Sequence, residues 1–458
     1  MTAQSVSGVG ESREFSVAGA RTYNRKSPVR WVLSHLWQHK VLLFGFLVSV
    51  LVTNVMFAAL PRFTGLAFDE VLKPEPSSRR LLTIALLILG FVLVRGVLDL
   101  IQSFSIETLG QRLERDSREE LYSSLLGKSQ TFHSRQRVGD IMARAGNDVR
   151  QLNPMMNPGV SLIVESMISL TVPLVFIALL SPPLLISPLL FILAFSITLR
   201  IYMRQLNPVS AKMRQQFGVV NAELNETITG IEVVKAMVQE KQEKQKFVNS
   251  AGLYRDYVAE QGRIQARYLP LLFLGFAFTG AFAHGLYLLS LGQITVGDLV
   301  AYMGLMGVLR FPAFISIFTF SLVQMGMTGA ERILELIREE TELDENTAGH
   351  SSIIKGEIIF DNVTFGYSDK PILKNLSFRA NPGETVAIVG QTGSGKSTIT
   401  KLVNRIYDVT DGRILIDGVN VKDWRLESLR SQISVIEQDV FLFSRTIKEN
   451  IAFGLGNK

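Results

Sequence analysis

Residues 385–401 read TVAIVGQTGSGKSTITK, and this stretch decides the fold that the sequence predicts. Its first half has the apolar composition of a buried strand, and its second half is a glycine-rich loop that opens a helix. Residues 390–397 match the pattern GxxxxGK(S/T), in which glycines let successive backbone N–H groups converge on phosphate oxygens. In such a loop Lys396 reaches the β- and γ-phosphates and Ser397 ligates Mg²⁺. The alternative is a turn rich in glycine and serine that holds no ligand.

The composition predicts that much of the chain lies in lipid, because 47% of its 458 residues are hydrophobic and only 19% are charged. The net charge of +6 is modest for this length, and the basic residues cluster between apolar segments. This pattern favours anionic lipid headgroups over nucleic acid as a partner. There is no cysteine, so disulfides and thiolate sites are excluded. Residues 1–26 are polar and small, which predicts a disordered tail and argues against a cleavable signal peptide.

Six apolar segments are long enough to cross a hydrocarbon layer about 30 Å thick. They cover residues 41–60, 81–101, 160–180, 184–203, 268–291 and 294–324. Buried helices of a soluble protein are the alternative, which six segments with so few charges disfavour. Short turns follow the third and fifth segments, whereas lysine and arginine gather in the two long loops. The positive-inside rule therefore predicts that both long loops and both termini are cytoplasmic.

The parts outside these segments carry helix signals as well. Residues 27–40 predict an amphipathic helix, either lying at the membrane interface or beginning the first span, with His35 on its wet face. Its apolar face is expected to hold Trp31, Val32, Leu33, Leu36 and Trp37. Residues 107–126 and 221–247 predict that the membrane helices continue into the cytoplasm as a stalk. Breaks are expected at residues 127–137 and 219–230, where a soluble domain could dock.

From residue 356 onward the sequence alternates apolar and polar residues as half-buried strands do. Short strands, the phosphate loop, a helix over residues 397–407 and the segments ILIDG and SVIEQD predict an α/β domain with mixed sheets. The predicted fold class is an α-helical membrane domain with six transmembrane helices, followed by an incomplete α/β P-loop nucleotide-binding domain. Its parts are an N-terminal tail and interfacial helix (1–40), the six-helix domain (41–330), a linker (331–355) and a partial nucleotide-binding domain (356–458).

Six spans, two long intracellular loops and a C-terminal P-loop domain resemble a half-size ATP-binding cassette (ABC) exporter of the multidrug and lipid exporter type, over residues 41–458. The segments FDNVTFGY, GRILIDG and VIEQDVFLFSRTIKENI add to the resemblance. It implies that Tyr367 stacks on adenine, and that Gln438 contacts Mg²⁺ and senses the γ-phosphate. Lys396 and Gln438 would be catalytic, and Ser397 and Gln438 would ligate the metal. The phosphates of ATP would be lined by Gly390, Gln391, Thr392, Gly393, Ser394, Gly395, Lys396, Ser397 and Thr398.

The same resemblance implies Mg²⁺ and ATP as cofactors, a second half-transporter as homo- or heterodimer partner, and coupling helices near residues 127–134 and 219–228. After Gln438 the sequence departs from the family pattern, because no LSGGQ-like signature, no apolar strand ending in Asp-Glu and no switch histidine follow. These residues therefore predict ATP binding but not hydrolysis. A fragment or a truncated gene model is the expected reason.

The predicted function is that of an ATP-driven exporter subunit for amphipathic drugs or lipids, multi-pass in the plasma membrane and working by alternating access. A membrane regulator that binds ATP without hydrolysing it and an importer with the exporter-type fold are the alternatives. Ionisable residues inside the spans are default candidates for substrate contact. They are Arg95, Asp99, Glu165, His284 and Arg310. Arg95 and Asp99, four residues apart, are also expected to neutralise each other, and Arg310, before Pro312, to mark a bend.

Overall fold

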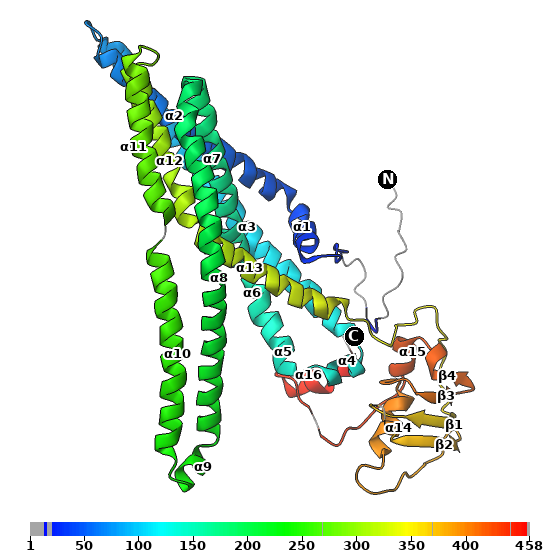
Figure 1. Cartoon of the computed structure of the whole chain (residues 1–458). Helices are drawn as coiled ribbons and strands as arrows, with labels where there is room; N and C mark the ends of the chain where they lie inside the picture. The colour runs from blue at the N-terminus through cyan, green and yellow to red at the C-terminus, as the bar shows by residue number, and fades with distance from the viewer. Residues whose placement is uncertain (1–12, 16–20, 268, 369, 440, 456–458) are drawn as a thin grey trace. The chain divides into compact units, whose positions relative to one another are not determined.

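The computed structural model describes residues 13–15, 21–267, 269–368, 370–439 and 441–455 (Figure 1). The chain divides into a membrane unit, residues 36–113 and 151–328, and a sheet-containing unit, residues 1–35, 114–150 and 329–458. The disordered tail predicted over residues 1–26 falls largely outside the described residues. The domain boundaries predicted near residues 40, 330 and 355 stay predictions.

Helices account for the apolar segments. Within the described residues, five helical stretches are long and apolar enough to cross a membrane. Four of them contain α2 (Lys40–Val71), α3 (Ser78–Leu126), α7 (Ser161–Leu180) and α8 (Ile186–Thr229), and the fifth, Phe273–Ser290, is part of α11 (Leu269–Ser290). A 3₁₀ turn, Pro182–Leu185, forms the predicted short connection between α7 and α8.

The sixth predicted segment is divided between α12 (Val296–Val308) and α13 (Arg310–Arg338). Proline has no N–H, so Pro312 cannot donate to the carbonyl of Val308 four residues before it. The helix is therefore interrupted at Leu309, close to the predicted bend. A capping box of Thr295 and Asp298 fixes the start of α12.

α2 and α12 approach each other unusually closely because glycines face the contact. A Cβ atom on Gly65 would overlap the backbone carbonyl of Gly297, and a Cβ on Gly304 would lie 2.7 Å from Cβ of Pro61. The Asp69 carboxylate accepts hydrogen bonds from Gly297 N (2.7 Å) and Thr295 Oγ1 (2.8 Å). Small residues that let backbones approach are a common basis of helix packing in membranes.

The long loops are helical, as predicted, but one of the two breaks is displaced. α4 (Gln130–Arg135) lies inside the first predicted break and is capped by the Ser129 side chain. It is followed by α5 (Val138–Ala143) and α6 (Val149–Pro154), with wider helical turns over residues 144–148 and 155–160. The break predicted over residues 219–230 and the coupling helix predicted near residues 219–228 are wrong in position. Those residues continue α8, and the short helix α9 (Ile231–Ala236) begins only after Gly230, before α10 (Glu240–Ala266).

The amphipathic helix predicted over residues 27–40 forms as α1 (Pro28–Gln38), but its faces differ from the prediction. His35, expected on the wet face, is fully buried: it stacks on Tyr23 with ring centroids 3.6 Å apart. Trp31 is buried as expected, and its Nε1 donates to Glu120 at 2.8 Å. Leu33 and Trp37, expected beside Trp31, are 55% and 72% exposed. The carboxylate of Glu120 attracts the polar edges of Trp31 and His35, and this contact sets the rotation of α1.

The sheet consists of four antiparallel strands in the order β2-β1-β3-β4. They are β1 (Ile358–Phe365), β2 (Leu373–Ala380), β3 (Asp411–Ile416) and β4 (Val419–Asn420). Phe360 of β1 pairs with Phe378 and Ile414 on its two neighbours, and its side chain is buried in a core with Leu402 and Trp424. The helices of this region are α14 (Lys396–Val403), α15 (Leu426–Arg430) and α16 (Ile447–Ile451).

Two predicted strands are not formed. Residues 384–390, before the phosphate loop, and residues 434–437 have no ladder partner within the described residues, and so the sheet is antiparallel rather than mixed. A strand needs a neighbour for its N–H and C=O groups, and Val389 and Ile436 are 91% and 97% exposed. The predicted helix over residues 397–407 is also shorter, since α14 ends at Val403.

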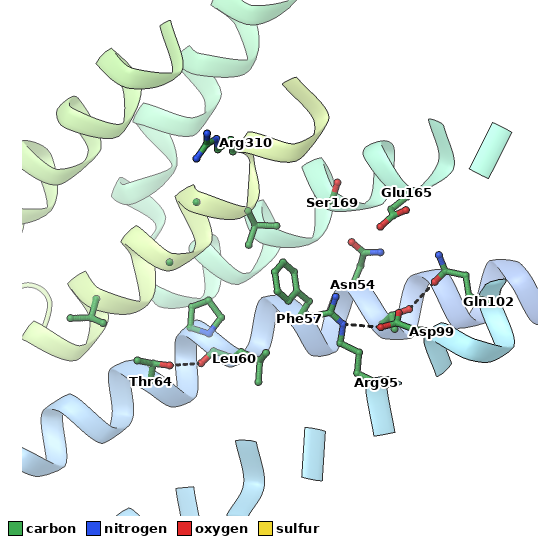
Figure 2. Close-up of a pocket in the computed structure, with 16 residues that line it drawn as sticks. Asn54, Phe57, Leu60, Thr64, Arg95, Asp99, Gln102, Glu165, Ser169 and Arg310 are labelled. Atoms are coloured by element: carbon green, nitrogen blue, oxygen red, sulfur yellow. Dashed lines mark hydrogen bonds and ion pairs between the residues drawn. The ribbon is translucent and has the colours of Figure 1, made fainter. Parts of the chain in front are cut away.

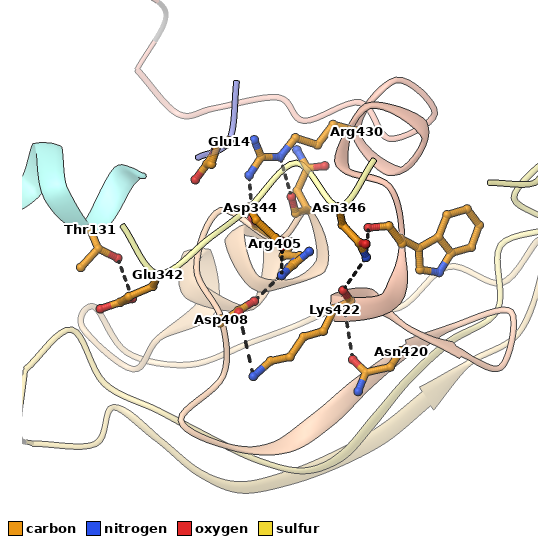
Figure 3. Close-up of polar contacts among 12 residues, drawn as sticks. Glu14, Thr131, Glu342, Asp344, Asn346, Arg405, Asp408, Asn420, Lys422 and Arg430 are labelled. Carbon is orange, nitrogen blue, oxygen red and sulfur yellow. Dashed lines mark hydrogen bonds and ion pairs between the residues drawn. The ribbon is translucent and has the colours of Figure 1, made fainter. Parts of the chain in front are cut away.

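Polar contacts tie the segment after α13 to the sheet-containing unit (Figure 3). Arg405, almost fully buried, lies 3.1 Å from Asp408 and 3.9 Å from Asp344, which belongs to the predicted linker. Arg430 forms a 2.7 Å ion pair with Glu14. Buried charges of this kind are stable only when paired, so these contacts fix the path of the chain into β1.

Candidate functional site

The phosphate-loop residues lie together at the start of α14, as the sequence predicts. Gly395 is the N-cap residue of this helix with φ +91°, and Gly393 has φ +87°, a region that side chains rarely tolerate. The loop is packed from behind, because a Cβ on Gly395 would lie 2.9 Å from side-chain atoms of Ile372 and Leu373. A helix start leaves N–H groups without carbonyl partners one turn earlier, and the loop at the start of α14 is therefore where an anion would bind.

Lys396 carries the positive charge of this loop. Its Nζ donates to the carbonyls of Gly390 (2.8 Å) and Gln391 (2.9 Å), so the ammonium lies against the loop itself. Ser397 follows directly in the first turn of α14. A Lys charge, a serine hydroxyl and convergent N–H groups are the donor set that a polyphosphate with Mg²⁺ requires, so the residues present fit this ligand.

Tyr367 is held beside the same helix. Its hydroxyl lies 3.2 Å from Thr398 Oγ1, and its ring makes an edge contact with Tyr407 at 5.1 Å. The ring is 45% exposed, which leaves surface for an aromatic ligand. Thr398 itself is 5% exposed, so its hydroxyl is directed to Tyr367.

Gln438 is not brought to this site. It is exposed in an irregular segment, and no hydrogen bond or ion pair joins it to the phosphate loop within the described residues. The remaining loop residues, Gln391, Thr392 and Ser394, lie in the turn before α14.

A second site is a cavity of about 920 Å³ inside the membrane unit (Figure 2). Helices α2, α3, α7, α12 and α13 all contribute to its wall. Most of the lining is apolar, including Phe57, Leu60, Pro61, Val300 and Val308. Such a volume and lining are typical of a site for a small organic molecule.

Four of the five ionisable residues predicted inside the spans line this cavity: Arg95, Asp99, Glu165 and Arg310. Arg95 Nε lies 3.4 Å from Asp99 Oδ2, which confirms the expected pair, and its guanidinium lies 4.3 Å above the Phe57 ring. The fifth residue, His284, does not line the cavity. Its buried Nδ1 has no hydrogen-bond partner within the described residues.

Neutral polar residues of the cavity were not predicted from the sequence. Thr53 and Asn54 of α2 and Gln102 of α3 line it, and Thr53 Oγ1 donates to Gln102 Oε1 at 3.3 Å. Amides within an apolar span are a signal of the same kind as charges, because they need partners in lipid. That signal could have identified Asn54, inside the first predicted segment, and Gln102, directly after the second.

Comparison with known families covers most of the chain. Residues 42–313 match the family model for the ABC transporter transmembrane region, and residues 373–457 match the family model for ABC transporter. The first match alone covers more than half of the chain and includes all residues that line the cavity. The second includes the phosphate loop and Gln438.

Similar proteins agree with this assignment. An uncharacterized ABC transporter ATP-binding protein of Bacillus subtilis, YknV, is 31% identical, with 94% of this chain and 73% of that protein covered. A putative multidrug export ATP-binding/permease protein of Staphylococcus aureus is 31% identical over 80% of this chain and 64% of its own length. The solved structure of a bacterial Atm1-family ABC exporter with ATP bound has a TM-score of 0.69 and 27% identity, with 90% of this chain and 74% of that chain covered. The chain therefore belongs to the ABC transporter family, as a half-size exporter in which a transmembrane region precedes the ATP-binding domain.

Proposed function

We propose that this membrane protein uses ATP bound at the phosphate loop to move amphipathic compounds, drugs or lipids, out of the cell. The observation that carries the proposal is the presence, in one chain, of a loop built for a polyphosphate and of a largely apolar cavity among the membrane helices. Such a transporter requires a binding site for ATP and a binding site for the transported compound.

In this proposal different residues bind different parts of the nucleotide. The backbone N–H groups from Gly390 to Lys396 bind phosphate oxygens, and the Lys396 ammonium moves from the loop carbonyls to the β- and γ-phosphates. The Ser397 hydroxyl would hold Mg²⁺, an ion that supplies positive charge beside the phosphates. Tyr367 would stack on adenine, and Gln438 would contact the metal only if its segment lay closer to the loop than it does in this structure.

The protein is proposed to act as a dimer with a second half-transporter, in the plasma membrane. Both termini and the nucleotide-binding domain lie in the cytoplasm, because the two long loops carry most of the lysine and arginine. The relative from Staphylococcus aureus is named as a multidrug exporter, which supports an amphipathic cargo.

The test combines nucleotide binding with transport by the full chain in vesicles. Mg-ATP binding is expected to fall at least tenfold in Lys396→Ala, since a charged hydrogen bond to phosphate is lost. Lys374→Ala is the matched control, because Lys374 lies exposed on β2. A fluorescent amphipathic dye should move across the membrane only with ATP and with Lys396 present. ATP binding without dye movement would contradict export and would favour the regulatory alternative.

A further inference from the structure

We propose that the cavity of the membrane unit selects zwitterionic amphipaths, with Glu165 binding the cationic group and Arg310 binding the anionic group. The inference rests on the proposed export function and narrows its substrate class. It follows from which charges of the cavity are already paired and which are not.

Arg95 and Asp99 neutralise each other. They lie one helical turn apart on α3 with a separation of 3.4 Å, and the Arg95 guanidinium is further held against the Phe57 ring. A ligand that used either residue would have to break this pair. The pair therefore contributes a fixed, neutral part of the wall.

Glu165 and Arg310 are different. Glu165 belongs to α7 and Arg310 to α13, and neither forms a hydrogen bond or an ion pair with any side chain that the structure describes. In Figure 2 the two residues lie apart and come from different helices of the cavity wall. A charge near lipid without a partner is unfavourable, so a ligand that pairs with it gains affinity.

The unpaired charges of Glu165 and Arg310 have opposite signs, and this determines the class of ligand that can pair with both. A cation leaves Arg310 unpaired, an anion leaves Glu165 unpaired, and a neutral compound leaves both unpaired. Only a molecule with one positive and one negative group satisfies both, while its apolar part covers Phe57, Leu60 and Val308. Sites that hold buried polar groups reject ligands that leave those groups without partners.

This chemistry has two natural sources, a zwitterionic phospholipid headgroup and a small peptide with free termini. Three amphiphiles with the same twelve-carbon chain separate the charge requirement from the apolar contact: dodecylphosphocholine, dodecyltrimethylammonium and dodecyl phosphate. The peptide Leu-Phe-Leu with free termini represents the second source. Tighter binding of dodecylphosphocholine than of the peptide assigns the lipid source, and the reverse assigns the peptide source.

Binding is measured for the full chain in nanodiscs of phosphatidylglycerol, a lipid without a cationic group, with empty nanodiscs as background. The unmodified chain is expected to bind at least one zwitterion about tenfold more tightly than either single-charge amphiphile. Glu165→Gln should weaken binding of the zwitterion and of dodecyltrimethylammonium by about tenfold and leave binding of dodecyl phosphate unchanged. Arg310→Gln should weaken binding of the zwitterion and of dodecyl phosphate and leave binding of dodecyltrimethylammonium unchanged.

Matched controls are Glu75→Gln and Arg79→Gln, which remove the same charges at exposed positions in the loop before α3 and in the first turn of α3. Equal binding of zwitterion and single-charge amphiphiles by the unmodified chain would overturn the inference, and this result needs no variant to fold. So would equal effects of Glu165→Gln on all three amphiphiles.

Mg-ATP binding is recorded on the same samples. If ATP binding depends on Lys396 but the chain shows no preference for zwitterions, the inferred substrate class is refuted and the proposed export function is not. Zwitterion preference without ATP binding refutes the proposed export function and leaves the cavity assignment standing.

Discussion

Replacing Gly304 by alanine should separate α2 from α12. A Cβ at this position would lie 2.7 Å from Cβ of Pro61 and 3.0 Å from its Cγ, whereas ordinary contact begins at 3.4 Å. Either helix must therefore move by about 0.7 Å, given these distances. The proline ring cannot rotate away, because it is fixed to the backbone of α2 at two points. We expect overpacking to lower the free energy of unfolding by about 1–3 kcal/mol.

Gly307→Ala is the matched control. Gly307 lies on the same helix three residues later and lines the same cavity, but no neighbouring atom lies within 4 Å of the position that a Cβ would take there. At this position alanine should stabilise the helix by up to about 1 kcal/mol, because glycine loses more backbone entropy on folding.

The assay is unfolding of the purified chain in mixed micelles, followed by circular dichroism. Gly304→Ala should unfold at a lower denaturant fraction than the unmodified chain, and Gly307→Ala at an equal or higher one. If the two variants shift equally, the close approach of α2 and α12 does not contribute to stability and the reasoning fails.

Three further predictions concern charges outside the spans. Burial, and then the charge of Arg13, lower the pKa of Lys128 from 10.5 to about 8, so the folded state binds this proton less tightly than the unfolded state does. The free energy of unfolding should therefore rise from about pH 8 to 10.5 in the unmodified chain but not in Lys128→Met. Thermal melts over this pH range measure the difference. Burial opposes ionisation of Asp417, but N–H donation from Lys355, Glu357 and Gly356 outweighs it and lowers the pKa of Asp417 below 3.8. Its stabilising effect over Asp417→Asn should therefore be present above about pH 4 and be lost as pH falls further; a constant difference would contradict this. Glu120→Gln should lower the unfolding free energy by about 1–3 kcal/mol and shift Trp31 fluorescence, because Glu120 accepts hydrogen bonds from Trp31 and Arg25 at 2.8 Å each.

Local chemistry explains which features the sequence predicted. The phosphate loop depends on glycines at fixed spacing, and Gly393 and Gly395 adopt the positive φ angles that such a loop needs. The spans depend only on length and hydrophobicity, so five of the six predicted spans form long apolar helices, and the sixth is divided between α12 and α13. The pair of Arg95 and Asp99 depends on helical spacing alone. Each of these features is decided within a few residues of the chain.

Features decided by distant residues were missed. His35 has a polar side chain that local sequence places on the solvent-facing side of the helix. Its burial is explained by its contacts with Glu120 and Tyr23. The apolar residues 384–390 predict a strand, but a strand also needs a neighbour, which the described residues do not supply. The cavity residues Thr53, Asn54 and Gln102 come from two helices, and their proximity follows only from packing. Tertiary contacts, not local propensity, determine these positions.

The contacts of Lys396 bear on how tightly a nucleotide can bind. Its ammonium already donates to two loop carbonyls, at 2.8 and 2.9 Å, so a phosphate must replace these hydrogen bonds rather than add to a free charge. The gain is the difference between charge-assisted bonds to anionic oxygens and bonds to neutral carbonyls, and the former are about twice as strong. The carbonyls that Lys396 releases then lose their donor. A nucleotide bound as proposed would therefore have to change the loop's own hydrogen bonds when it binds.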